Sequence, residues 1–153
     1  MGNAINRIVK QFEALQHGDC WIGCNFKEVL HAVDYKKAMM SIDGNANSIW
    51  MLVAHITYWR TSVVNRLTGS DNPPPFSDFH LPDEANAETW HQALQDFEAA
   101  YHLLRNAIHH FNEDNLDKPS VKPEQTNYEL ILGCLQHDAY HLGQIMLLKK
   151  VSA

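Results

Sequence analysis

The chain has 153 residues, of which 45% are hydrophobic and 20% charged, with a formal net charge of −6. These values indicate one globular domain over residues 1–153, with enough apolar side chains for a core that needs no disulfides. The acidic balance and the lack of a basic run argue against nucleic acid or a membrane as the partner, and no apolar run could span a bilayer. Because the N-terminus lacks the apolar segment of a signal peptide, we expect a cytoplasmic protein.

The chain contains three cysteines, Cys20, Cys24 and Cys134. Their odd number argues against a disulfide framework. Cys20 and Cys24 do not have the spacing of a C-x-x-C redox motif, and no second pair lies nearby to complete a zinc site. We therefore expect reduced thiols with a structural role.

The first third of the chain predicts one long helix and two short ones. Apolar residues at helical spacing predict a helix over Asn3–His17, and two short helical pieces follow over about 26–32 and 34–40. Residues 41–45 contain a turn signal. The second long helix is expected over Ser48–Leu67.

His55 lies in the middle of this second long helix. It shares one face with Leu52 and Trp59, so we expect its ring to point into the core. A histidine in that place is either a core residue satisfied by one hydrogen bond or a metal ligand. The helix alone does not decide between these two interpretations.

Residues 68–86 form a long connection with four prolines. Connections of this length in a compact domain are often functional or cover something. We expect either a lid over a site or a simple crossover between helices.

The third long helix is predicted over Ala87–Phe111, and it carries His91, His102 and His109 on one line. That line lies roughly 120–140° around the helix from the apolar face, so these rings should face solvent. They are also two or three turns apart, which is too far to share one ion. We therefore do not expect them to be metal ligands.

The last helix is predicted over Asn127–Val151, and Thr126 with Glu129 forms a capping box at its start. His137 and His141 stand four residues apart, so both rings lie on one helix face, a turn apart. Two imidazoles placed in this way can hold one divalent ion from the same side. Alternatively, each is a buried histidine satisfied by hydrogen bonds.

Four long helices without any strand-like alternation predict an all-α fold, a four-helix bundle with a short helical insert between the first and second long helices. In such a bundle His55 can meet His137 and His141 across the core. Three neutral imidazoles leave a divalent metal with open coordination positions, which is typical of catalytic sites, whereas structural sites are closed by four protein ligands.

Two segments of the sequence carry a resemblance to a known family: Asn47-Ser48-Ile49-Trp50 leading to His55-Ile56-Thr57-Tyr58-Trp59-Arg60, and His137-x-x-x-His141-Leu142-Gly143-Gln144-Ile145. With them the chain resembles the DinB-like (YfiT-like) proteins over nearly its whole length. The resemblance implies a four-helix bundle with one divalent metal ion (Zn, Ni, Fe or Mn) bound by His55, His137 and His141. Members often form dimers, so a homodimer is expected.

The characterised relatives include bacillithiol-using thiol-S-transferases and mycothiol-dependent maleylpyruvate isomerases, and others are classed as metal-dependent hydrolases. The chain departs from the isomerases by ending at Ala153 without their added C-terminal domain. The resemblance thus implies a metal-dependent enzyme of thiol-transferase or hydrolase type, acting on a small molecule such as a low-molecular-weight thiol. The alternative is a non-catalytic metal-binding or stress-associated bundle.

No general base can be assigned from the residues. Asp138 follows a candidate ligand, but neighbouring helix residues point about 100° apart, so it is expected either to support a ligand or to be solvated. Cys134 lies one turn before His137 and is expected to be a small core residue.

Overall fold

A computed structural model describes residues 3–42, 44 and 46–151 of the chain. In this part the regular structure is helical, and the only pairing of extended residues is one isolated bridge between Pro119 and Thr126. The elements are α1 (Ala4–His17), α2 (Phe26–Leu30), α3 (Tyr35–Met39), α4 (Ile49–Leu67), α5 (Ala87–His109), a 3₁₀ turn η1 (Glu113–Asn115) and α6 (Asn127–Val151).

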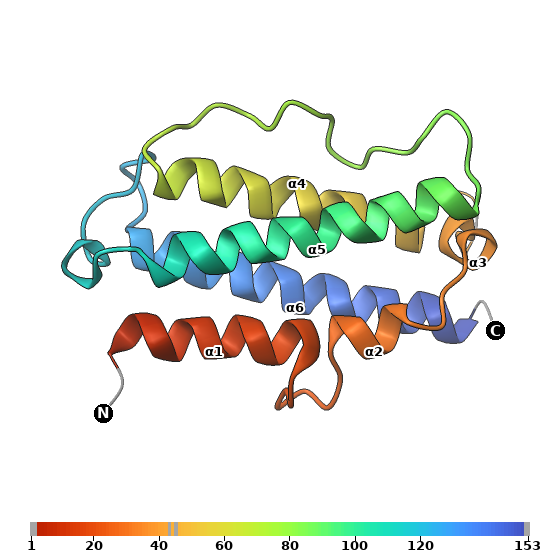
Figure 1. Ribbon diagram of the computed structural model, residues 1–153, viewed down its shortest axis with the longest axis horizontal. Helices are drawn as coiled ribbons and strands as arrows, with labels where there is room; N and C mark the ends of the chain where they lie inside the picture. The colour runs from red at the N-terminus through yellow and green to blue at the C-terminus, as the bar shows by residue number, and fades with distance from the viewer. Residues whose placement is uncertain (1–2, 43, 45, 152–153) are drawn as a thin grey trace.

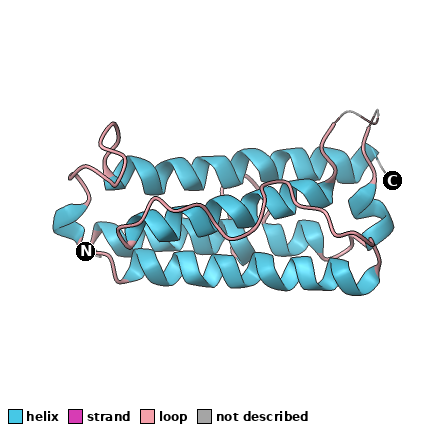
Figure 2. Ribbon diagram, turned by 90° about the horizontal axis from the view of Figure 1, so that it is seen from above, coloured by secondary structure: helices cyan, strands magenta, loops and turns pink. Residues whose placement is uncertain are grey.

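The four long helices α1, α4, α5 and α6 lie side by side as a bundle, and the short helices α2 and α3 lie between α1 and α4 in the chain (Figure 1). Helices α4 and α5 run in the same direction, whereas α1 and α6 run in the opposite one. Because α4 and α5 are parallel, residues 68–86 must return along the whole length of the bundle, and Figure 2 shows them crossing its outside. The expected four-helix bundle with a short helical insert is confirmed.

The helices begin where polar caps satisfy the first free backbone N–H groups. The side chains of Asn3, Ser48 and Asn86 each accept a hydrogen bond from the backbone N–H three residues further on. At α6 the Thr126 N–H donates to Glu129 Oε2 at 2.7 Å, and the Glu129 N–H donates to Thr126 Oγ1 at 3.1 Å, so the predicted capping box is confirmed.

The predicted helix ends are also close to those observed. Helix α5 ends at His109, two residues before the expected Phe111. Helix α2 begins as expected but ends at Leu30, and α3 is shorter than expected by one residue at each end. Within the turn expected at 41–45, Asp43 and Asn45 lie outside the described residues.

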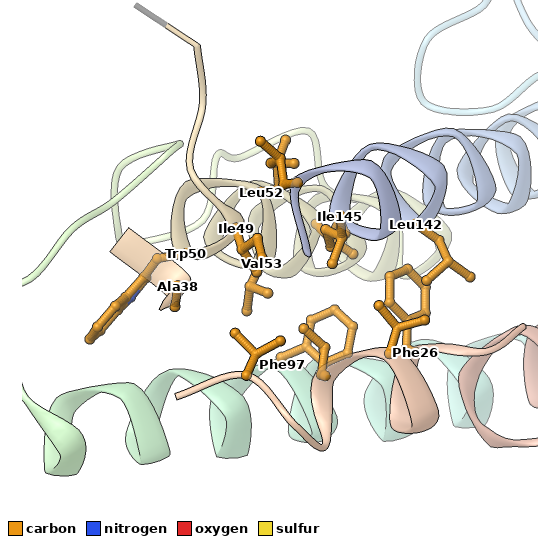
Figure 3. Close-up of a cluster of buried hydrophobic side chains, with 14 of the residues drawn as sticks. Phe26, Ala38, Ile49, Trp50, Leu52, Val53, Phe97, Leu142 and Ile145 are labelled. Atoms are coloured by element: carbon orange, nitrogen blue, oxygen red, sulfur yellow. The ribbon is translucent and has the colours of Figure 1, made fainter. Parts of the chain in front are cut away.

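The apolar side chains form two clusters along the bundle. The first is built around Phe26, Trp50, Phe97 and Ile145, and Figure 3 shows it between the helices. The second lies toward the other end of α5 and includes Tyr101 and Leu104. Burial of these side chains is the main stabilising contribution to the helices, which would be marginal in isolation.

Cys20, Cys24 and Cys134 are free thiols, as expected. Among the helices that the structure describes, none is both long enough and apolar enough to cross a membrane.

Candidate metal centre

Three histidine rings from two helices converge at one point of the bundle. His137 Nε2 lies 3.0 Å from His55 Nε2 and 3.1 Å from His141 Nε2, and the three candidate ligand atoms all lie within 4.8 Å of one another. His55 comes from the middle of α4, and the other two come from successive turns of α6. His55 and His141 are buried, whereas 28% of the His137 side chain is exposed. The cluster therefore opens to solvent on the His137 side.

The other ring nitrogens of His55 and His141 have hydrogen-bond acceptors. His55 Nδ1 donates to Asp78 Oδ1 at 2.7 Å, and His141 Nδ1 donates to Gln144 Oε1 at 2.6 Å. Because a carboxylate or an amide oxygen only accepts, each of these rings carries its proton on Nδ1. In the neutral rings both Nε2 atoms are therefore bare lone pairs.

These lone pairs explain why the cluster suits a cation. His137 Nε2 could donate one proton, so it could satisfy only one of the two bare nitrogens that face it. A divalent ion would satisfy all three at once. Two nitrogens bound to one ion at about 2.1 Å are roughly 3.0–3.4 Å apart, and the separations of 3.0 and 3.1 Å from His137 Nε2 to the other two rings agree with this range, while the third pair lies within 4.8 Å. The donor set and its spacing thus fit a divalent metal.

Burial favours the neutral form of two of the rings. Burial lowers the pKa of His55 below its ordinary value, and the hydrogen bond and charge of Asp78 oppose this effect in part. Burial likewise lowers the pKa of His141, with the hydrogen bond to Gln144 opposing. Because only neutral imidazole binds a metal, the lowered pKa values favour the ligand-competent form.

The connection 68–86 covers His55. Asp78 accepts the His55 hydrogen bond, and the Phe79 ring stacks on the His55 ring with centroids 4.0 Å apart and an angle of 14° between the planes. Phe79 has a φ of 52°, which is uncommon for a bulky residue and costs on the order of 1–3 kcal/mol. The sequence left open whether this connection is a lid or a crossover. It is a crossover that also closes one side of the histidine cluster.

Sequence reasoning missed the two acceptors. Asp78 lies in an aperiodic loop, where no spacing relates it to a helix residue 23 positions earlier. Gln144 stands three residues after His141, on the same side of one helix, and this spacing was the signal that could have assigned its role.

Asp138 is fully buried, so the solvated alternative for this residue is wrong. Its Oδ2 accepts a hydrogen bond from Arg60 Nε at 2.8 Å, and Arg60 is also buried. The residue that follows His137 on α6 therefore also points into the bundle, toward Arg60 of α4.

The other candidates fall outside the cluster. His91, His102 and His109 are exposed on α5, as predicted. Cys134 is buried in the second apolar cluster, and burial raises the pKa of its thiol well above the ordinary value. It is a core residue, as expected. A hollow of about 560 Å³ lies between α4, α5 and the crossover, but no residue of the histidine cluster lines it.

The fold and this cluster define a helical-bundle protein with a candidate three-histidine metal site. A family model described as the DinB superfamily matches residues 25–145, and the chain belongs to that superfamily. The match contains all three histidines, and it confirms the resemblance seen in the sequence. Comparison with curated proteins found no match, and comparison with solved structures found none either.

Proposed function

We propose that this protein binds one divalent metal ion through His55, His137 and His141 and uses it in an enzymatic reaction of thiol-transferase or hydrolase type on a small molecule. The observation that carries the proposal is the pair of bare Nε2 atoms on His55 and His141, both directed at His137 Nε2. Superfamily membership supports the same assignment.

The number of ligands favours catalysis over a purely structural role. Within the described residues the cluster consists of three histidines, with no cysteine or carboxylate as a fourth member. Catalytic metal sites keep positions open for water or substrate, whereas structural sites are closed. When bound, a divalent ion there would lower the pKa of a coordinated thiol or water and could polarise a carbonyl group.

The protein's own residues orient the ligands and shape the approach. Asp78 and Gln144 fix two rings through their Nδ1 atoms, and such partners hold the ring direction and raise the basicity of the ligand. Phe79 covers one side of His55, and Trp59 lies 6.2 Å from the rings of both His55 and His137. A substrate would therefore approach on the His137 side, past aromatic surfaces.

The proposal is tested by elemental analysis of protein purified without a metal-affinity tag, followed by two assays. The first is conjugation of bacillithiol, cysteine or glutathione to a bimane electrophile, and the second is hydrolysis of a nitrophenyl ester. The matched control is a His55→Ala/His141→Ala variant purified in the same way. We expect one equivalent of metal and metal-dependent turnover in one assay. Bound metal without turnover in either assay would favour the non-catalytic alternative, and failure to bind any divalent ion would overturn the proposal.

A further inference from the structure

The third histidine, His137, has no acceptor for its Nδ1 atom, although the other two have theirs. We propose that Asp138, held in place by Arg60, is the positioning residue for His137 and accepts a hydrogen bond from His137 Nδ1. The inference rests on the proposed metal site, but it concerns residues that contribute no ligand atom themselves.

Asp138 and Arg60 form an ion pair in the interior of the bundle, with side-chain exposures of 0% and 1%. Arg60 Nε donates to Asp138 Oδ2 at 2.8 Å, and Arg60 Nη2 donates to Gln16 Oε1 at 2.9 Å. The guanidinium also lies over the Phe97 ring, 4.4 Å from its centroid. These contacts fix Arg60 and, through it, the orientation of the Asp138 carboxylate.

Only one oxygen of the Asp138 carboxylate accepts a hydrogen bond. Asp138 Oδ1 is buried without a hydrogen-bond partner, and so is His137 Nδ1. The two atoms lie 3.7 Å apart. Unpaired buried polar atoms are destabilising, so a facing donor and acceptor left unpaired require an explanation. Shortening this Nδ1–Oδ1 distance to that of a hydrogen bond requires a movement of about 0.7 Å. A small rotation of the His137 ring, which is partly exposed, supplies this movement.

The ring orientation that this hydrogen bond selects is the one the site needs. With its proton held on Nδ1, His137 presents a bare Nε2 toward the Nε2 atoms of His55 and His141. Each of the three rings then has an acceptor on its Nδ1 side: Asp78, Gln144 and Asp138. Carboxylate or carbonyl acceptors of this kind fix the tautomer of ligating histidines.

The same contacts connect the site to helices that supply no ligand. Gln16 of α1 accepts from Arg60 of α4, and Gln16 Nε2 donates to Glu98 Oε2 of α5 at 2.8 Å. Asp138, the carboxylate partner of Arg60, adds α6 to this chain of contacts. The orientation of His137 thus depends on the packing of all four long helices.

A single substitution of Asp138 would leave Arg60 buried and unpaired, and the protein could fail to fold. The test therefore uses two double variants, Arg60→Met/Asp138→Leu and Arg60→Met/Asp138→Asn. Both remove the ion pair, and the side chains at 138 have similar size, but only asparagine can accept a hydrogen bond from His137. Circular dichroism checks that both fold.

Two measurements compare these variants with the parent protein. Zinc affinity is measured by competition with a chromophoric chelator, and the tautomer of His137 is read from long-range ¹H–¹⁵N spectra of protein labelled at histidine. We expect the leucine variant to bind zinc about 10- to 100-fold more weakly than the parent and the asparagine variant to bind within about threefold. In the metal-free proteins the His137 proton should lie on Nδ1 in the parent and the asparagine variant and lose that preference in the leucine variant.

Equal zinc affinities and equal His137 tautomers in the two metal-free double variants would overturn the inference. Failure of the proposed metal site is a different result, namely no zinc binding by the parent protein. In that case the spectra of the metal-free proteins still test whether Asp138 orients His137. The inference requires His137 to carry its proton on Nδ1 in the parent and to lose that preference in the leucine variant.

Discussion

Asp78 Oδ1 accepts a hydrogen bond from His55 Nδ1 at 2.7 Å, although the two residues are 23 positions apart and lie on different elements. The crossover between α4 and α5 therefore supplies a hydrogen-bond acceptor to the histidine cluster as well as connecting the two helices. Because Phe79 stacks on the same ring, the loop both orients His55 and shields it from solvent.

Replacing Asp78 with alanine should weaken metal binding about 10- to 100-fold, because His55 would lose the acceptor that fixes its tautomer and ring direction. Titration with zinc against a chromophoric chelator measures the effect. Asp83→Ala, which removes an exposed carboxylate from the same loop, is the matched control and should bind as the parent does. An Asp78→Ala protein that cannot be told apart from this control would contradict the role given to the loop.

Replacing His55, His137 or His141 singly with alanine should remove most of the bound metal, because two imidazoles in a partly apolar pocket hold an ion weakly. Elemental analysis measures the metal, and far-ultraviolet circular dichroism should show that the helices persist, since the apolar clusters stabilise them. The control carries His91→Gln, His102→Gln and His109→Gln together. Because these three residues are exposed on α5, it should keep its metal. Loss of metal from the control would mean that the metal site lies on α5 and that the assignment to α4 and α6 is wrong.

The metal-free protein should lose stability as the pH falls below the ordinary histidine value of 6.5. The pKa values of His55 and His141 are lowered in the folded state, so between those values and 6.5 the unfolded chain binds more protons than the native one. The free energy of unfolding therefore decreases through this window and is unaffected by these groups above it.

Urea unfolding of chelator-treated protein between about pH 7.5 and 5 tests this pH dependence. A His55→Gln/His141→Gln variant should show a flatter dependence, whereas His91→Gln should behave as the parent. The interpretation would be wrong if the double variant lost stability on acidification as steeply as the parent.

Replacing Arg60 alone with methionine should lower the free energy of unfolding by about 3–5 kcal/mol, because Asp138 would stay buried without its counter-charge. Arg60→Met/Asp138→Leu should recover most of this loss, since removing both members of a buried ion pair is often close to neutral. Denaturant unfolding of both variants provides the comparison. A loss below about 1 kcal/mol in the single variant would mean that water reaches Asp138.

The sequence predicted the helices well because local chemistry determines them. Caps such as Ser48 and the Thr126–Glu129 pair lie next to the helices they begin, and apolar periodicity shows which face is buried. The meeting of His55 with His137 and His141 followed from two such faces in one bundle, and the structure brings the three together. That they bind a metal ion stays a prediction.

What the sequence by itself determined is thus the set of helices, their buried faces and the histidines that lie on those faces, since each depends on spacing along a single helix. Only the tertiary structure decided which groups hold those rings. Asp78 reaches His55 because parallel α4 and α5 force residues 68–86 back along the bundle. Asp138 is buried because α6 packs against Arg60 of α4 at this position, and the two side chains form an ion pair in the interior of the bundle. Both contacts join residues distant in the chain, and their positions depend on how whole helices pack, which periodicity within one helix does not encode.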